Sequence, residues 1–303
     1  MHHLHPLAQH LTLGQAVFLG VLQGFSELFP ISSLGHIIVI RALLHWHFNT
    51  HNRHFLSFIV ALHLATAAAL VIYFWKPWWR VLRAYLGSLR RRQFVYDEAS
   101  KLAWLLVAGT IIVGLVGLIL EKKFRLFFDN PAYLPLVAVF LILNGAVMAL
   151  GDYLKKKSLR RTAQSKPRRA EELSFPVAAA VGGCQTLALF PGISRSGAAM
   201  VGGILAGLSY EEACRFAFML ATPVIGAAGL LKVPALFAPP ARAILHLTLP
   251  AALAAGVVAY LSTAFLMKYF KTNHLWPFAI YCVLLGAGTL AIWHGLFVPP
   301  LRR

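Results

Sequence analysis

Six apolar runs, each long enough to cross a lipid bilayer, constrain this chain more than any other feature. They occupy residues 55–75, 101–120, 132–151, 212–231, 245–267 and 275–297. Hydrocarbon offers no water to backbone N–H and C=O groups, so a spanning segment must bond them internally, and runs of this length do so as helices. Hydrophobic residues make up 59% of the chain and charged residues only 13%, which excludes an ordinary soluble domain. The sequence therefore predicts an all-α polytopic integral membrane protein.

Two further apolar segments, at about 12–44 and 174–208, are interrupted near their middle by Pro, Gly and Ser. Each interruption reads Phe-Pro followed by hydroxyl residues. With a one-residue gap, the paired positions are Phe29 and Phe190, Pro30 and Pro191, Ser32 and Ser194, Ser33 and Arg195, and Gly35 and Gly197. Downstream, Leu64-Ala-Thr66 is repeated as Leu220-Ala-Thr222. This pattern predicts inverted-topology repeats, each with a re-entrant helical hairpin, and an active centre where the repeats meet.

The chain is expected to form one membrane domain, 1–303, with repeat halves 12–153 and 174–297 joined by a basic cytoplasmic loop, 154–173. The net charge is +18, and fourteen of the 28 Lys and Arg residues lie in two interhelical stretches, 76–92 and 155–169. The positive-inside rule places both stretches in the cytoplasm near anionic lipids, which makes nucleic acid an unsuitable partner. Both termini should then face outward, with the first hairpin entering from outside and the second from inside.

The three cysteines lie apart in apolar segments and form neither a CxxC pair nor a Cys-His cluster. We therefore expect small buried hydrophobes rather than a disulfide framework or a zinc site. These residues are Cys184, Cys214 and Cys282.

Among ten acidic residues, only Glu27 lies well inside an apolar segment. An ionisable group in hydrocarbon is costly and usually serves a partner or a wet cavity, so Glu27 is a functional candidate. Arg195 stands at the tip of the second broken segment. Its planar guanidinium suits bidentate phosphate binding, and hydroxyls and glycine amides lie beside it. The alternatives are a purely structural Glu27–Arg195 pair, or a capping serine next to a snorkelling arginine. The residues beside Arg195 are Gly192, Ser194, Ser196 and Gly197.

His36 shares a short polar turn with Ser32, Ser33 and Glu27, which favours a chemical role over simple packing. His63 lies on the first apolar run, and its role is less certain from sequence.

At these residues the chain resembles the undecaprenyl-diphosphate phosphatase family of the BacA/UppP type. The first family motif, Glu/Gln-x-x-x-Glu followed by Pro-x-Ser-Ser-x-Gly-His, is matched by Gln23, Glu27, Pro30, Ser32, Ser33, Gly35 and His36. The second, Pro-Gly-x-Ser-Arg-Ser-Gly, is matched by Pro191, Gly192, Ser194, Arg195, Ser196 and Gly197. The resemblance runs nearly end to end.

The resemblance implies a multi-pass hydrolase of the bacterial plasma (inner) membrane. Such an enzyme cleaves undecaprenyl (polyprenyl) diphosphate to the monophosphate and inorganic phosphate, with its active site open to the periplasmic side. This reaction recycles the lipid carrier of peptidoglycan synthesis, so it supports cell-wall biogenesis and cell shape and confers bacitracin resistance. The resemblance also leaves a homodimer open.

The family pattern assigns catalytic roles to Glu27, Ser33, His36 and Arg195, and gives Glu27 a divalent cation, Mg²⁺ or Ca²⁺. Arg195 would hold phosphate oxygens. Ser33 would attack phosphorus with His36 as base, although attack by His36, or by water that His36 activates, stays open. The remaining motif residues are expected to bind substrate: Gln23, Ser32, Gly192, Ser194, Ser196 and Gly197.

Three positions depart from the commonest family form: Gln23 replaces Glu, Leu34 replaces Ser or Thr, and Ala199 replaces Thr. The last two remove hydroxyls that we expect beside the site. Two rival functions follow from the same features. Broken helices in inverted repeats are a transporter architecture, so the chain could flip a prenyl phosphate without cleaving it. It could also be a catalytically silent lipid-binding paralogue. Phosphate release by the purified protein separates these alternatives.

Overall fold

The computed structural model describes residues 11–46, 53–128, 131–161, 167–237 and 244–295. Within these ranges the chain forms helices, and its only β-type pairing is an isolated parallel bridge between Arg168 and Leu208. Five helices are each long and apolar enough to span a membrane, or six if the bent pair α3–α4 counts as one span. The prediction of an all-α polytopic membrane protein is confirmed.

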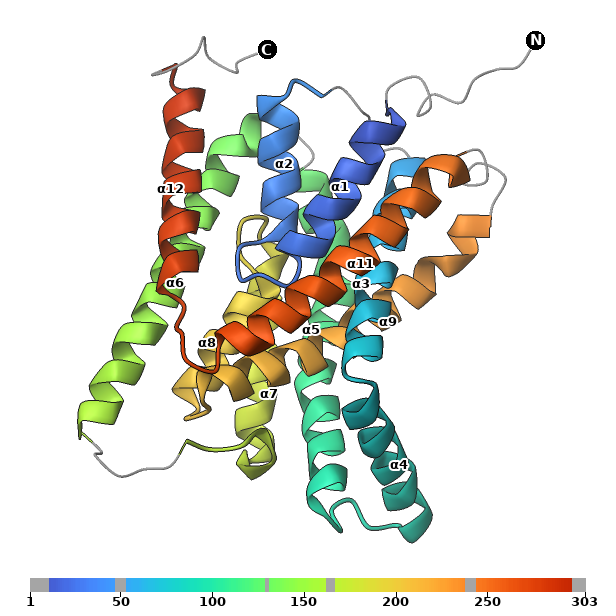
Figure 1. Ribbon diagram of the computed structural model, residues 1–303, viewed down its shortest axis with the longest axis vertical. Coiled ribbons are helices and arrows are strands. Elements are labelled where there is room, and N and C mark those ends of the chain that lie inside the picture. The colour runs from blue at the N-terminus through green and yellow to red at the C-terminus, as the bar shows by residue number, and fades with distance from the viewer. Residues whose placement is uncertain (1–10, 47–52, 129–130, 162–166, 238–243, 296–303) are drawn as a thin grey trace.

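The helices follow the apolar runs closely. Their bounds are α1 Leu13–Ser26, α2 Ser33–Leu43, α3 Arg53–Tyr73, α4 Trp75–Arg91, α5 Glu98–Phe128, α6 Leu134–Arg161, α7 Phe175–Gly183, α8 Arg195–Leu205, α9 Tyr210–Phe237, α11 Leu245–Tyr269 and α12 Trp276–Trp293. Short 3₁₀ turns occupy η1 Pro131–Tyr133, η2 Ala170–Glu172 and η3 Cys184–Leu189. Both broken segments fold as hairpins, α1–α2 and α7–η3–α8. Figure 1 shows them entering the bundle from opposite ends, with their tips near its middle.

Each hairpin is held by close packing of its first helix on a long span. α1 packs on α11, where a Cβ added at Gly20 would lie 2.1 Å from the Ala251 carbonyl oxygen. α7 packs on α5, where a Cβ at Gly182 would lie 2.1 Å from the Gly109 carbonyl oxygen. Lipid tails are as apolar as the helix surfaces, so the hydrophobic effect does not drive helices together inside a membrane. Helices there associate through close contacts between small residues such as these. A larger residue at either glycine would push the hairpin off its span.

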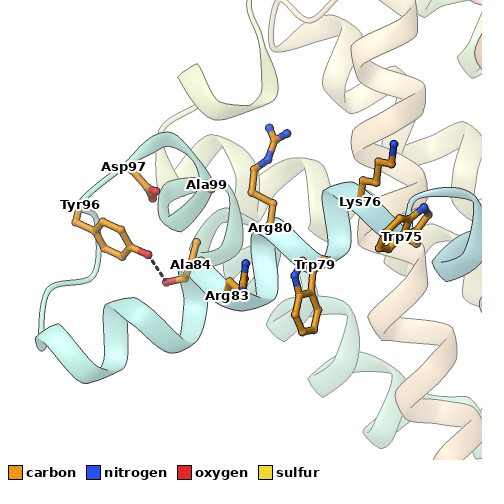
Figure 2. A pocket seen from close by; sticks show the side chains of 9 residues that line it. All are labelled: Trp75, Lys76, Trp79, Arg80, Arg83, Ala84, Tyr96, Asp97 and Ala99. Atoms are coloured by element: carbon orange, nitrogen blue, oxygen red, sulfur yellow. Dashed lines mark hydrogen bonds between the residues drawn. The ribbon is translucent and has the colours of Figure 1, made fainter.

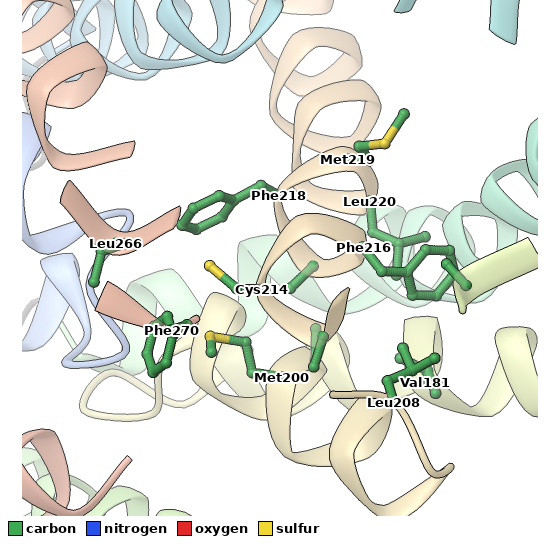
Figure 3. Packing of buried hydrophobic residues seen from close by; sticks show 14 of the residues in the cluster. Val181, Met200, Leu208, Cys214, Phe216, Phe218, Met219, Leu220, Leu266 and Phe270 are labelled. Atoms are coloured by element: carbon green, nitrogen blue, oxygen red, sulfur yellow. The ribbon is translucent and has the colours of Figure 1, made fainter. Parts of the chain in front are cut away.

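The main hydrophobic core lies around α9, which is the most buried of the candidate spans. Figure 3 shows its side chains meeting residues of α7, α8 and α11. Cys214 and Cys282 are buried and Cys184 is half-buried, and all three thiols are free. The expected burial is confirmed for Cys214 and Cys282 but not for Cys184.

Two expectations about the connecting segments are wrong. The basic stretch 76–92 is mostly the helix α4, not a loop. Its apolar residues recur at helical spacing, and α4 packs on α5 with Val81, Ala84 and Ser88 buried. The second basic stretch begins inside α6, which continues to Arg161. Helices α5 and α9 also extend past the apolar runs 101–120 and 212–231, to Phe128 and Phe237. In Figure 1, α4 and the end of α6 lie at the lower end of the bundle, opposite the start of α1 and the end of α12. The division into halves 12–153 and 174–297 stays a prediction.

Candidate active site

The second helix of each hairpin begins at a serine N-cap. Ser32 Oγ accepts the Gly35 N–H at 3.3 Å, and Ser194 Oγ accepts the Gly197 N–H at 3.1 Å. A capping hydroxyl satisfies one of the free N–H groups at a helix start. The two serines and the two glycines are the positions that the sequence motifs pair. Residues at paired motif positions therefore make the same capping hydrogen bond in the two hairpins.

The same residues join the two hairpin tips. Ser32 Oγ also accepts the Gly192 N–H at 3.1 Å, while Ser196 Oγ donates to the Phe29 carbonyl at 3.3 Å. Ser32 has a φ of 72° and Gly192 a φ of 113°, both in the left-handed region. A Cβ at Gly192 would lie 2.6 Å from the Val137 carbonyl oxygen, so only glycine fits there. These strained positions persist because the opposite tip holds them.

Asn144, on α6, bridges both tips. Its Nδ2 donates to the Pro30 carbonyl at 2.9 Å, and its Oδ1 accepts the Ser194 N–H at 3.0 Å. The side chain is buried, so both bonds lie away from water. One amide thus satisfies a backbone group of each hairpin, as irregular backbone in a membrane requires.

Glu27 is the centre of a second polar group beside the joined tips. Arg195 Nη2 donates to Glu27 Oε1. Ser33 Oγ donates to Glu27 Oε2 at 2.6 Å, and Gln23 Nε2 donates to the same oxygen at 3.0 Å. His63, from α3, brings its Nε2 to 3.5 Å from Oε2. We call these five side chains the Glu27 cluster.

His36 does not belong to this cluster. Its Nδ1 donates to the Ser32 carbonyl at 2.7 Å, and its Nε2 lies 2.8 Å from the Tyr281 hydroxyl of α12. A carbonyl can only accept, so Nδ1 carries the proton and Nε2 of the neutral ring accepts from Tyr281. Both ring nitrogens are thus engaged away from Ser33.

His63 was not identified firmly by sequence. It sits on an apolar helix outside both motifs, and only an ionisable group in a spanning run signals it. Its Nδ1 donates to the Ile59 carbonyl at 2.9 Å, which aims Nε2 at Glu27. Asn144 and Tyr281 gave no sequence signal beyond being polar groups in apolar segments.

The Glu27 cluster is buried on its acidic side and open on its cationic side. The Glu27 side chain is 5% exposed, against 23% for Arg195 and 28% for His63. One guanidinium nitrogen is bonded to Glu27, and the fork has four further N–H donors in all. An anion would therefore meet Arg195 first, with the Ser33 hydroxyl close behind.

The motif residues thus fall into two sets. The first set forms the helix caps and the contacts between the tips, and consists of Ser32, Gly192, Ser194, Ser196 and Gly197. The second set surrounds Glu27 and consists of Gln23, Ser33 and Arg195.

Neither of the two departures that remove a hydroxyl leaves a polar group beside it unpaired. Leu34 is 47% exposed, and Ala199 is buried in the hydrophobic core. A hydroxyl at position 199 would need a partner of its own.

The chain matches the family model described as "Bacitracin resistance protein BacA" over residues 16–288. It is 41% identical to the undecaprenyl-diphosphatase of Mycolicibacterium paratuberculosis, covering 96% of this chain and 100% of that protein. It is 44% identical to the undecaprenyl-diphosphatase of Acidiphilium cryptum (91% and 96% covered) and 45% identical to undecaprenyl-diphosphatase 2 of Chromobacterium violaceum (90% and 95%). This chain belongs to the BacA bacitracin resistance protein family.

Proposed function

We propose that this chain is a membrane phosphatase that hydrolyses undecaprenyl diphosphate to the monophosphate and inorganic phosphate, which recycles the lipid carrier of cell-wall synthesis. The observation that carries the proposal is the Glu27 cluster. There a serine hydroxyl is bonded to a buried carboxylate at 2.6 Å, next to an arginine that faces the open side. The names of the relatives support the same reaction.

The geometry favours Ser33 as the nucleophile and Glu27 as the group that takes its proton. Ser33 Oγ would form a bond to the terminal phosphorus while the bond from that phosphorus to the bridging oxygen breaks, releasing the prenyl monophosphate. Water would then cleave the phosphoserine and restore the hydroxyl. Arg195 would bind the phosphate oxygens on which charge develops. His36 would act as a positioning residue that holds the Ser32–Ser33 turn.

A divalent cation fits this site only as a partner shared with substrate. Among the described residues, no group of three or more His, Cys, Asp or Glu side chains could hold one. Glu27 offers a carboxylate, and the buried Oε1 of Gln23 has no hydrogen-bond partner, so it can serve as a second oxygen ligand. Mg²⁺ commonly binds through one or two protein oxygens plus phosphates and water. Bound there, Mg²⁺ or Ca²⁺ would neutralise diphosphate charge.

A purely structural Glu27–Arg195 pair predicts different behaviour from a catalytic one. Removing one partner of a buried pair leaves an unpaired charge and costs about 3–5 kcal/mol, so single variants lose stability in either case. We therefore compare Glu27→Gln and Arg195→Gln with the double variant. The double variant should regain stability but release phosphate at least 100-fold more slowly than the unaltered protein, as loss of electrostatic catalysis does. Recovered hydrolysis in the double variant would reduce the pair to a structural role.

Phosphate release by the unaltered protein addresses the two rival functions. A flippase should move a prenyl phosphate across vesicles without cleaving it, and a silent paralogue should bind the lipid without turnover. Phosphate release from undecaprenyl diphosphate by the purified protein, with Mg²⁺ or Ca²⁺ present, would exclude both rivals.

We also propose that the halves are inverted repeats with re-entrant hairpins, and that phosphate is released at the outer face of the bacterial inner membrane. Support comes from the matched caps and from the matched packing of α1 on α11 and α7 on α5. Helix α4 and the end of α6 carry basic residues, and in Figure 1 they lie at the opposite end of the bundle from the start of α1. In a background without native cysteines, an impermeant thiol reagent applied to intact cells should label Leu13→Cys and spare Arg92→Cys and Lys157→Cys. The reverse labelling would place the site on the cytoplasmic side.

A further inference from the structure

A cationic pocket lies on α4, outside the Glu27 cluster. α4 leaves α3 at a bend of 86°, and a cavity of about 420 Å³ lies between its first turns and the segment that leads into α5. Figure 2 shows this α4 pocket from close by. Its lining residues are Trp75, Lys76, Trp79, Arg80, Arg83, Ala84, Tyr96, Asp97 and Ala99.

The α4 pocket carries an excess of positive charge. Three cations, Lys76, Arg80 and Arg83, face one carboxylate, Asp97, which leaves +3 − 1 = +2. Asp97 Oδ1 already accepts the Ser100 N–H at 2.7 Å at the start of α5. None of the three cations has a carboxylate within 4.0 Å in the described part of the chain. Three neighbouring cations without acidic partners repel one another, and an anion would relieve that repulsion.

Arginine geometry narrows the class of anion. The guanidinium of Arg83 lies over the Trp79 ring, 5.1 Å from its centroid, which fixes the plane of its fork. A planar fork donates two parallel N–H groups to two oxygens of a phosphate. A cavity of about 420 Å³ is large enough for a phosphate with attached groups.

The rest of α4 indicates what is attached to that phosphate. At about 100° per residue, the apolar residues that α4 leaves exposed fall within one stripe about 80° wide, and the pocket cations occupy the neighbouring face. This stripe consists of Trp75, Trp79, Leu82, Leu86 and Leu89. A helix with an exposed apolar face beside a cationic face lies at a membrane surface, with its apolar side among acyl chains. Tryptophan at the boundary fits the same position.

We propose that the α4 pocket binds the headgroup phosphate of an anionic phospholipid, with the acyl chains along the apolar stripe. Such binding would hold the α3–α4 bend at the membrane surface. Free phosphate shares the headgroup chemistry but gains nothing from the stripe, so lipid is the occupant that the arrangement favours.

The test compares two variants that lose the same charge. The pocket variant is Lys76→Gln/Arg80→Gln/Arg83→Gln, and the control variant is Arg90→Gln/Arg92→Gln/Lys157→Gln. All six residues are exposed, but those of the control variant lie outside the pocket. Full-length protein in detergent is titrated with phosphatidylglycerol, with phosphatidylcholine of the same chains, and with inorganic phosphate, and bound ligand is counted by native mass spectrometry. Unchanged melting temperatures report folding. If the triple variant does not fold, Arg80→Gln is compared with Arg90→Gln.

The affinity of the pocket variant for phosphatidylglycerol should fall by about 100-fold, since each cation near a membrane surface contributes about fivefold. The control variant should stay close to the unaltered protein, and phosphatidylcholine should bind weakly throughout. Equal losses in both variants would mean diffuse charge and overturn the proposal. Equal binding of the two lipids, or displacement of phosphatidylglycerol by inorganic phosphate at matched concentration, would also overturn it. None of these readouts depends on hydrolysis.

Discussion

Replacing Asn144 with leucine should uncouple the two hairpin tips without changing the identity of any residue in the Glu27 cluster. Leucine has the same branched skeleton of side-chain heavy atoms as asparagine but bulkier terminal groups, so the change removes polarity and creates no cavity. The Pro30 carbonyl and the Ser194 N–H would then lose the bonds they make at 2.9 and 3.0 Å. Both groups would be left buried in an apolar protein interior.

The cost follows from the two groups left unpaired. A buried donor or acceptor without a partner costs about 1–3 kcal/mol, which gives about 2–6 kcal/mol for two. The Cys282 thiol, 3.9 Å from the Pro30 carbonyl oxygen, can compensate weakly, so we expect about 2–4 kcal/mol. Hydrogen bonds inside membrane proteins average about 0.6 kcal/mol each, which sets a floor of about 1 kcal/mol. Displacement of the tips by about 1 Å should also slow hydrolysis about 100-fold.

The assay is unfolding in detergent micelles or bicelles, run together with phosphate release by the same preparation. Asn273→Leu makes the same chemical change at an exposed position and should cost less than about 0.5 kcal/mol. If Asn144→Leu were as stable and as active as Asn273→Leu, the bridge would not hold the tips, and the account of the site built on it would fail.

Three shorter predictions concern other side chains. Ser33→Ala should abolish hydrolysis in a phosphate-release assay. His36→Asn keeps a donor for the Ser32 carbonyl and should retain measurable activity. The opposite ranking of the two variants would favour His36 as nucleophile. His63→Leu removes a polar partner of the buried carboxylate and should lower kcat about tenfold, while His63→Gln, which keeps a donor, should lower it less. Asp152 accepts two N–H groups at the start of α12, at 3.0 and 3.1 Å. Asp152→Leu should therefore lower the free energy of unfolding by about 3 kcal/mol and leave kcat unchanged, and Asp152→Asn should lower it less.

The spans and the hairpins could be predicted because a membrane imposes simple rules. Apolar length identifies a spanning helix, and proline, glycine and serine in an apolar segment mark where it breaks. The helical ends were less predictable. Lys155 donates to the Leu208 carbonyl, and its ammonium group lies over the Tyr210 ring. These contacts at the bundle surface stabilise α6 beyond the end of the apolar run. Hydropathy alone carries no such information.

The Glu27–Arg195 contact could also be anticipated, because two opposite charges in hydrocarbon need each other. The role of each serine could not. Ser32 and Ser33 are adjacent and chemically alike, yet the first caps α2 and receives the opposite tip, while the second donates to the carboxylate. Ser32 has a left-handed backbone, and its hydroxyl accepts the Gly192 N–H of the second hairpin, a contact that local sequence does not reveal.

His36 illustrates the limit of reasoning from spacing. It lies three positions after Ser33, a spacing at which side chains on one helix are neighbours. The bond from Nδ1 to the Ser32 carbonyl and the hydroxyl of Tyr281 instead turn the ring toward α12. Tyr281 is 245 residues away in sequence from His36, so no local pattern could reveal it.

The Glu27–Arg195 pair forms only when the two hairpin tips dock against each other. An irregular tip inside hydrocarbon needs partners for its backbone groups, and here each tip supplies the partners of the other through Ser32, Gly192 and Ser196. Neither tip is therefore satisfied without the other. Docking of the tips is also what brings Arg195 to Glu27, because these residues stand on opposite hairpins. The charges that would cost most in an isolated hairpin are thus paired only once the site exists, so substitutions in the tip-joining residues should reduce activity by preventing assembly of the site.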